Sequence, residues 1–346
     1  MRTNLLWLFR FIYVFVGSIV LLAASAWGLG ALYFHGHRIP AYIFFGIGLV
    51  ALAGFLLRFA LRAGIWSLGG LALFALLFVV LFIWYSTIKP SNDHQWQPDV
   101  IRLASGTLDG DLLTVRNIRN LDYRTETDYT VRYYDKTYDL KKLTSVDVFS
   151  VYWMGPSIAH LFLSFGFEDK DYLAISVELR KEVGETYQAL PGLFRRYEIY
   201  YVVADEGDVV RVRTTFRKDP PEQVYLYRTK ITKENARTLL LDYVNTMNDL
   251  AVHPDFYNTL TTNCTTAIYI HARAVSNRSR YNWKLLLSGY TAEYMYEIGS
   301  LNTSIPFEEL QRRSLINDKA NTVGNVEDFS QKIREGLPFP ASPNTP

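Results

Sequence analysis

The chain has 346 residues, 49% of them hydrophobic, and its 36 Lys and Arg nearly balance its 34 Asp and Glu, for a net charge of +2. This composition is too apolar for a disordered chain, and the length suggests two structural units. Residues 1–90 contain six basic residues and no acidic residue, so this segment carries +6 and the remainder carries −4. The mildly acidic remainder lacks the basic surface of a nucleic-acid-binding protein, so we expect no nucleic-acid partner. A single cysteine excludes an internal disulfide framework and a CxxC zinc site.

Three apolar runs, at about residues 11–33, 41–57 and 64–86, predict transmembrane helices. Each is close to the ~20 residues that a helix needs to cross the hydrocarbon core of a bilayer. The first run is longer than the apolar core of a signal peptide, about 7–15 residues, and two further runs follow it. We therefore interpret all three runs as retained spans within a membrane segment of residues 1–88.

The orientation of these spans follows from their short flanking segments. Arg2 and Arg10 precede the first span, and Arg58 and Arg62 lie between the second and the third. Positive residues favour the cytoplasmic side, so the N-terminus is expected in the cytoplasm and everything after the third span outside the cytoplasmic membrane. Residues 89–98 are polar and bounded by prolines, which predicts a short linker to an extracytoplasmic domain of residues 99–346.

The domain is predicted to be α+β. Short strands are expected at residues 129–134. Runs rich in β-branched and aromatic residues, separated by turn signals, predict the strands of an antiparallel or meander-like sheet at residues 157–167, 172–180, 197–204, 209–216 and 223–227. Helical spacing of apolar residues predicts a buried helix over 235–250 with Thr232 as its cap, and further helices are expected at 263–275, 307–313 and 326–334, before an irregular tail from Pro338. The acidic residues at 205–208 are interpreted as a hairpin turn, with a cation site as the alternative.

The lone cysteine, Cys264, lies where small polar residues give way to the predicted helix at 263–275. In the first helical turn, unpaired N–H groups and the positive end of the helix dipole favour the reactive thiolate. The neighbouring Asn263 can cap the helix, or its amide can donate to an oxyanion. The alternative is that Cys264 is a buried small hydrophobic residue, which is a common role for a single cysteine.

A nucleophilic cysteine needs a base, and the chain has six histidines. Three lie in a membrane loop or the linker, and His253 precedes a proline in a loop. His271 follows Cys264 by seven residues, about 10 Å along a helix axis, which is too far for a direct hydrogen bond. His160, in a strand entered through a tight turn, is therefore the candidate base, although a structural strand histidine is the alternative.

The next predicted strand supplies candidate partners for this histidine. Its alternation places Ser176, Glu178 and Arg180 on one face. Glu178 is the candidate to orient the imidazole, as the third group of a catalytic triad does, with Ser176 and Arg180 in support. The alternative pairs Glu178 with Arg180 or Arg211 in a structural salt bridge.

These residues fall in motifs that resemble a bacterial family first described as a domain of unknown function and also named the Lnb N-terminal periplasmic domain. The motifs are GPSIAH at 155–160, LSFGF at 163–167, SVELRKE at 176–182, YVVADE at 201–206 and YNTLTTNCTT at 257–266, within a resemblance that runs from Asn117 to His271. The resemblance implies a papain-like fold of the permuted NlpC type, in which the histidine precedes the cysteine. It also implies that Cys264 is the nucleophile and His160 the base.

Relatives in this family include lipoprotein N-acyltransferases, so the resemblance favours an acyltransferase of the bacterial inner membrane with a periplasmic catalytic domain. The expected donor is a phospholipid and the expected acceptor an amine or hydroxyl, as on a lipoprotein, with neither cofactor nor metal. One alternative is a cysteine hydrolase acting on a cell-wall peptide or a lipid ester. The other is a non-catalytic envelope scaffold with a degenerate site. Trp153, Phe162, Phe165 and Tyr257 are candidates to line an acyl groove, with core packing as the alternative.

Overall fold

The computed structural model describes residues 2–61, 66–275 and 280–340. Arg62, the first two residues of the third predicted span and the last six residues of the predicted tail lie outside these ranges. The chain forms two compact units. The first comprises Met1–Pro90 and Gln188–Arg196, and the second comprises Ser91–Tyr187 and Tyr197–Pro346.

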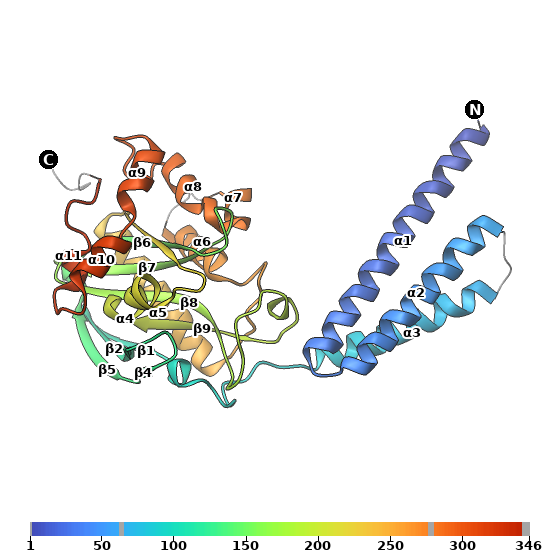
Figure 1. Cartoon of the computed structure of the whole chain (residues 1–346), viewed down its shortest axis with the longest axis horizontal. Coiled ribbons are helices and arrows are strands. Elements are labelled where there is room, and N and C mark those ends of the chain that lie inside the picture. Colours follow the sequence, from blue (N-terminus) through green and yellow to red (C-terminus); the bar gives the residue numbers. More distant parts are fainter. Residues whose placement is uncertain (1, 62–65, 276–279, 341–346) are drawn as a thin grey trace. The chain divides into compact units, whose positions relative to one another are not determined.

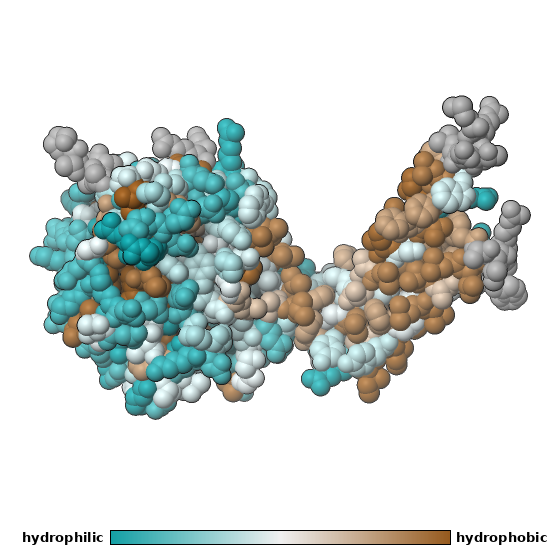
Figure 2. Space-filling model, turned by 45° about the horizontal axis from the view of Figure 1, so that its top comes forward, coloured by the Kyte–Doolittle hydropathy of each residue, from teal (hydrophilic) through white to brown (hydrophobic). Residues whose placement is uncertain are grey.

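The first unit contains the three predicted spans as helices α1 (Arg2–Phe34), α2 (Arg38–Leu61) and α3 (Trp66–Ser86) (Figure 1). Their apolar stretches, Trp7–Phe34, Arg38–Phe59 and Leu68–Ser86, are long enough to cross a membrane. Only 6%, 28% and 17% of the residues in the apolar windows of these stretches are buried, and Figure 2 shows the mostly brown, hydrophobic surface of the helices. A helix surface that is apolar nearly all round is suited to lipid, so the chain fits a membrane protein.

Gln188–Arg196, expected within the periplasmic domain, belongs instead to the helical unit. The Phe194 ring lies 5.3 Å from that of Phe34, and its carbonyl oxygen is 2.8 Å from His35 Nε2. Arg195 Nη1 donates to the Tyr85 carbonyl at 3.0 Å. The expected linker also differs, because the second unit already begins at Ser91.

The second unit is built on an eight-stranded sheet in the order β1-β2-β9-β8-β7-β6-β10, with β5 also paired to β2. Neighbouring strands are antiparallel except β2 and β9, so the predicted α+β class is confirmed. The strands are β1 (Ser105–Asp109), β2 (Leu112–Arg119), β5 (Tyr133–Asp139), β6 (Leu143–Tyr152), β7 (Ala159–Phe167), β8 (Asp171–Arg180), β9 (Glu198–Ala204) and β10 (Gln223–Arg228), and a separate pair is formed by β3 (Asp122–Tyr123) and β4 (Tyr129–Thr130).

Helices cover both faces of this sheet (Figure 1). One face packs on α5 (Lys233–Val252) and α6 (Cys264–Val275), and the other on α4 (Glu206–Arg211), α10 (Asn317–Val323) and α11 (Phe329–Lys332). Three further helices are α7 (Trp283–Leu286), α8 (Thr291–Glu297) and α9 (Phe307–Ser314). Phe162 and Phe165 are fully buried on opposite faces, so both belong to the core and not to a groove.

Two local predictions are wrong. Residues 209–216, predicted as a strand, form the end of α4 and a π-helical turn, Val212–Phe216. The predicted hairpin turn at 205–208 is the start of α4, where Asp208 is fully buried and accepts hydrogen bonds from Arg119 at 2.8 and 3.0 Å. The β-branched composition is that of a strand, but the segment continues the helix that begins at 206, where the buried carboxylates of Asp208 and Glu206 pair with Arg119 and Arg334.

Other elements agree with their predictions within a few residues. The predicted strands 157–167, 172–180, 197–204 and 223–227 correspond to β7, β8, β9 and β10, and the main predicted helices correspond to α5, α6 and α9. The segment 326–334 is helical only in α11, and 129–134 is divided between β4 and β5. No group of three or more potential metal ligands occurs among the described residues.

Arg334, beyond α11, joins the C-terminal region to the sheet. It is 6% exposed, and its guanidinium donates to Asp147 at 2.8 Å and to Glu206 at 2.7 Å, both of which are buried carboxylates. We expect Arg334→Ala to destabilise the second unit by about 3–5 kcal/mol, because it leaves two buried charges without this partner. The measurement is the thermal unfolding midpoint of the full-length protein. The control, Arg312→Ala, removes an exposed ion pair with Glu309 and should change the midpoint little; equal shifts would contradict the expectation.

Candidate active site

The site lies where two adjacent strands separate. β7 and β8 pair from Phe167–Asp171 as far as Phe162–Ser176, and no farther. Beyond that point β7 remains paired with β6, and β8 remains paired with β9. The backbone of Leu161 therefore loses its neighbour on the β8 side. This fork in the sheet is the place where a helix from one face can meet side chains from the other.

The helix that enters the fork is α6, whose start is fixed by Asn263. Its Oδ1 accepts from the N–H groups of Thr265 and Thr266 at 2.9 and 3.0 Å, and Thr266 Oγ1 in turn accepts from the Asn263 N–H at 2.8 Å. Asn263 Nδ2 donates to the Thr259 carbonyl at 2.8 Å. Of the two roles expected for Asn263, the structure supports the cap. Cys264 is the first residue of α6, so its amide N–H is one of those that have no intrahelical acceptor.

The Cys264 sulfur lies within hydrogen-bonding reach of the His160 side chain and of the Leu161 backbone. Burial raises the pKa of the Cys264 thiol, but the charge and hydrogen bond of His160, together with the Leu161 N–H, lower it to a greater extent. Burial likewise lowers the pKa of His160, but the negative charges of Glu178 and Cys264 raise it to about 9. At neutral pH the lowered pKa of the thiol and the raised pKa of the imidazole favour a thiolate paired with an imidazolium.

The other side of the imidazole contacts residues of β8. His160 Nε2 lies 2.8 Å from Ser176 Oγ and 3.0 Å from Glu178 Oε1, and the Ser176 hydroxyl donates to the same carboxylate oxygen at 2.8 Å. Because Nε2 is engaged there, Nδ1 is the ring nitrogen left for the thiol. Ser176 and Glu178 thus lie beside the histidine, as expected from their alternation along the strand.

Glu178 is itself held by Arg213, which was not among the predicted site residues. Arg213 Nη2 donates to Glu178 Oε1 at 3.0 Å, and Nη1 donates to the Val209 carbonyl at 2.9 Å. Burial raises the pKa of Glu178, but His160 and Arg213 hold it well below its usual range. The partner of Glu178 is therefore Arg213, and neither Arg180 nor Arg211. An arginine inside an apolar run is the available signal, because a buried guanidinium requires an acidic partner.

Arg180, predicted to support the site, has a different role. Its guanidinium donates to the carbonyls of Val100 and Ile101 at 3.0 and 2.9 Å and lies 4.1 Å from the Trp96 ring centroid. The alternation correctly places Arg180 on the face of Glu178, but its side chain binds the first segment of the second unit. The prediction for Arg180 is corrected accordingly.

The turn before His160 is held by a segment distant in the sequence. Gly155 has a φ of +79°, which favours glycine. Gly289 N donates to the Ser157 carbonyl at 3.0 Å, and Ser288 Oγ accepts from Ala159 N at 2.9 Å. A side chain at position 289 would collide with the backbone of this turn, since a Cβ there would lie 2.0 Å from a carbonyl oxygen. These contacts fix the chain immediately before the histidine.

Tyr187 is a further residue near the site that the sequence did not indicate. Its side chain is 49% exposed, and its ring lies 6.5 Å from that of Trp153. Burial of part of the side chain, together with the negative charges of Cys264 and Glu178, raises the pKa of Tyr187. This hydroxyl therefore remains protonated at neutral pH.

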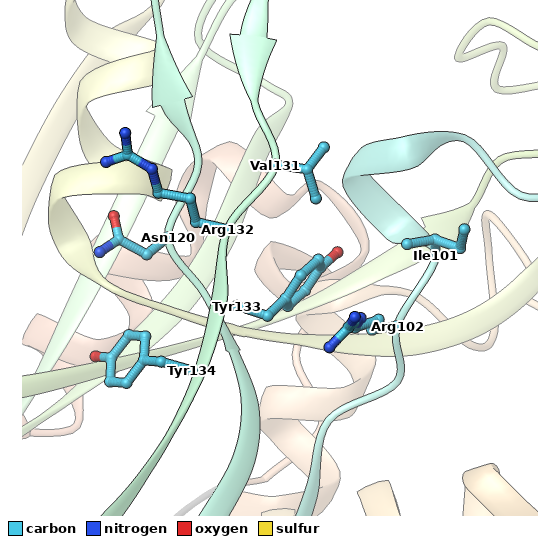
Figure 3. A pocket seen from close by; sticks show the side chains of 7 residues that line it. All are labelled: Ile101, Arg102, Asn120, Val131, Arg132, Tyr133 and Tyr134. Atoms are coloured by element: carbon cyan, nitrogen blue, oxygen red, sulfur yellow. The ribbon is translucent and has the colours of Figure 1, made fainter.

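Two cavities of the second unit matter for assigning the site. A depression of about 700 Å³ is lined by Ile101, Arg102, Asn120 and Val131 to Tyr134 and contains none of the predicted site residues (Figure 3). A second cavity, of about 440 Å³, has Ile268, Ala272 and Val275 of α6 in its wall. The second cavity thus shares a helix with Cys264.

Comparison with known protein families finds a match for the central part of the chain. Residues 129–290 match the family described as the Lnb N-terminal periplasmic domain. This Lnb-type domain begins after the three apolar helices and includes His160, Glu178 and Cys264, so the resemblance seen in the motifs is confirmed. No curated protein and no solved structure matches the chain.

The pairing of Cys264 with His160 predicts how its reactivity depends on pH. Since the imidazolium lowers the pKa of the thiol against the effect of burial, His160→Ala should move the iodoacetamide reactivity profile of Cys264 to higher pH. At pH 7 the alkylation rate should fall at least about tenfold. The control His253→Ala alters an exposed histidine and should leave the profile in place. An unchanged profile in His160→Ala would show that the thiol is not paired with this imidazole.

The negative charge of Glu178 predicts a shift in the pKa of His160. The pKa of His160 is raised to about 9, so the imidazolium persists below that pH and is lost as pH rises through it. Glu178→Gln removes a negative charge and should lower this midpoint by one unit or more. The measurement is an NMR titration of histidine labelled at Cε1, with the signal assigned by its loss in His160→Ala. Glu168→Gln, an exposed carboxylate paired with Lys142, is the control; equal midpoints in wild type and Glu178→Gln would exclude the proposed contact.

Proposed function

We propose that this protein is a membrane-anchored acyltransferase that moves an acyl chain from a phospholipid to an amine or hydroxyl acceptor through a thioester on Cys264. The observation that carries the proposal is the contact of the Cys264 thiol with His160, itself bound to Glu178, at the start of a capped helix. This combination supplies a nucleophile, a proton carrier and an oxyanion donor, which are the groups that acyl transfer requires.

In the first half-reaction, the Cys264 thiolate attacks the carbonyl carbon of the donor ester. The backbone N–H of Cys264 donates to the oxyanion of the tetrahedral intermediate. The carbon–oxygen bond of the ester then breaks, and the His160 imidazolium gives its proton to the departing lysophospholipid alkoxide. The products are a lysophospholipid, a neutral His160 and an acyl thioester on the enzyme.

In the second half-reaction, an amine or hydroxyl of the acceptor attacks the thioester carbonyl. His160 takes the proton that the acceptor loses, and the carbon–sulfur bond breaks to regenerate the thiolate. Glu178 remains ionised throughout and keeps the imidazole in position. The thioester conserves the energy of the donor ester, so the transfer proceeds without a nucleotide.

The apolar helices support a donor that resides in a bilayer. Three candidate spans occur on the same chain as the site, and the family to which residues 129–290 belong is periplasmic by description. With the N-terminus in the cytoplasm, as the flanking arginines favour, an odd number of spans carries the domain to the periplasm. A phospholipid is then the ester that surrounds the protein.

The test is the covalent state of Cys264 in the full-length protein. Incubation with phosphatidylethanolamine vesicles should add the mass of one acyl chain to the peptide containing Cys264, and neutral hydroxylamine should remove it. Cys264→Ala should lack the adduct, and His160→Ala should form it at least about tenfold more slowly, within the range that a general acid–base group contributes.

The acceptor step is tested by adding a peptide with a free N-terminal amine. Transfer should produce the N-acylated peptide and consume the adduct. Release of free fatty acid alone would instead indicate a lipid hydrolase, and cleavage of added muropeptides would indicate a cell-wall hydrolase. No acyl adduct with any phospholipid, together with full cellular function of Cys264→Ala, would overturn the proposal in favour of a scaffold.

A further inference from the structure

A cavity of about 440 Å³ lies along α6 inside the second unit. Its size falls within the range of pockets that bind small molecules, about 300–1,000 Å³. One wall is formed by Ile268, Ala272 and Val275 of α6, and the facing wall by Val146, Val148 and Leu163 of the sheet. The cavity is thus a space between the helix and the sheet, bounded by aliphatic side chains on both sides.

This cavity lies one turn of α6 beyond the nucleophile, which is not itself among the lining residues. Ile268, Ala272 and Val275 follow Cys264 by four, eight and eleven residues, so all four lie on one stripe of the helix. Each of them is half-buried, whereas Ala267 and His271 on the adjoining stripe are buried in the core. The accessible stripe therefore runs from Cys264 to the end of α6, a distance of about 16 Å.

The sheet wall leads to the same point. Leu163 is two residues beyond Leu161 on the same face of β7, and Leu161 is the residue whose backbone bonds the Cys264 sulfur. Val148 on β6 is paired directly opposite Leu163. Helix wall and sheet wall thus both begin one step past the nucleophile and continue in the same direction.

The chemistry of these walls selects an alkyl chain. A peptide or a sugar would bring N–H, C=O and hydroxyl groups that need partners, which the aliphatic side chains of the facing walls do not provide. Polar lining residues, among them Lys230, Thr232 and Ser300, belong to segments other than α6 and the two strands. An alkyl chain requires no partner, and each buried CH₂ strengthens its binding about fourfold.

We propose that this cavity holds the acyl chain of the donor while Cys264 attacks its ester, and then the acyl chain of the thioester. The inference rests on the proposed function. It adds where the apolar part of the substrate binds and which residues contact it. With the carbonyl carbon at Cys264, the chain lies along Ile268 and Ala272 and ends near Val275. The depth of the cavity then sets the preferred chain length.

Thioester formation with p-nitrophenyl esters of four, eight and sixteen carbons tests this arrangement in the full-length protein. Wild type should favour the sixteen-carbon ester. Ala272→Trp should reduce the thioester yield from the sixteen-carbon ester at least tenfold and leave the yield from the four-carbon ester unchanged. Val275→Trp, at the far end, should reduce the yield from the sixteen-carbon ester but not from the eight-carbon ester. Ile270→Trp, on the exposed side of the same helix, is the control and should match wild type. Iodoacetamide alkylation of Cys264 at the wild-type rate shows that each variant is folded.

A second readout does not depend on the thioester. In a Cys264→Ala background, palmitic acid with a diazirine on its chain should cross-link to peptides containing Ile268 or Leu163, and Ala272→Trp should abolish these cross-links. If the cross-links form but wild type yields no thioester with any ester, the cavity stands and the proposed acyl transfer fails. If Ala272→Trp changes neither the cross-links nor the chain-length preference, the cavity assignment is overturned.

Discussion

The separation of β7 and β8 beyond the Phe162–Ser176 pair is the constraint on which the site depends. A fully paired sheet would use the Leu161 N–H in a ladder bond and would keep residues of its two faces apart. With the strands parted, this N–H binds the sulfur of Cys264, which comes from a helix on one face. His160 and Glu178 come from the other face and meet the sulfur at the same opening.

Charges alternate through the site from Arg213 to Glu178, His160 and Cys264. Burial opposes the charged forms of Glu178, His160 and Cys264. Each charge is stabilised by the opposite charge beside it, which is why the pKa of Glu178 and Cys264 moves down while that of His160 moves up. The reactivity of the thiol thus depends on all four residues. Removal of Glu178 or His160 alters the pKa of the residues next to it.

Local patterns predicted those parts of the domain in which local forces decide the conformation. The small polar residues before Cys264 provide the cap that begins α6, and the alternation in β8 places Ser176 and Glu178 side by side. Prediction failed at residues 209–216, where β-branched residues occur in a helix and a π-turn held by buried ion pairs. Prediction failed also for Arg180. The strand alternation places it on the correct face, but the alternation does not indicate which carbonyl groups its guanidinium binds.

The sequence by itself determined the three apolar spans and the division of charge between the two parts of the chain. It also indicated Cys264 as the candidate nucleophile and His160 as the candidate base. Each of these follows from composition, from the start of one helix or from a short motif. Only the tertiary structure decided that Arg213 holds Glu178, that Gly289 supports the turn before His160, and that a cavity lies along α6 beyond Cys264. These features join segments that lie tens of residues or more apart in the chain. Such contacts depend on how helices pack against the sheet, and no local pattern of side chains encodes that packing.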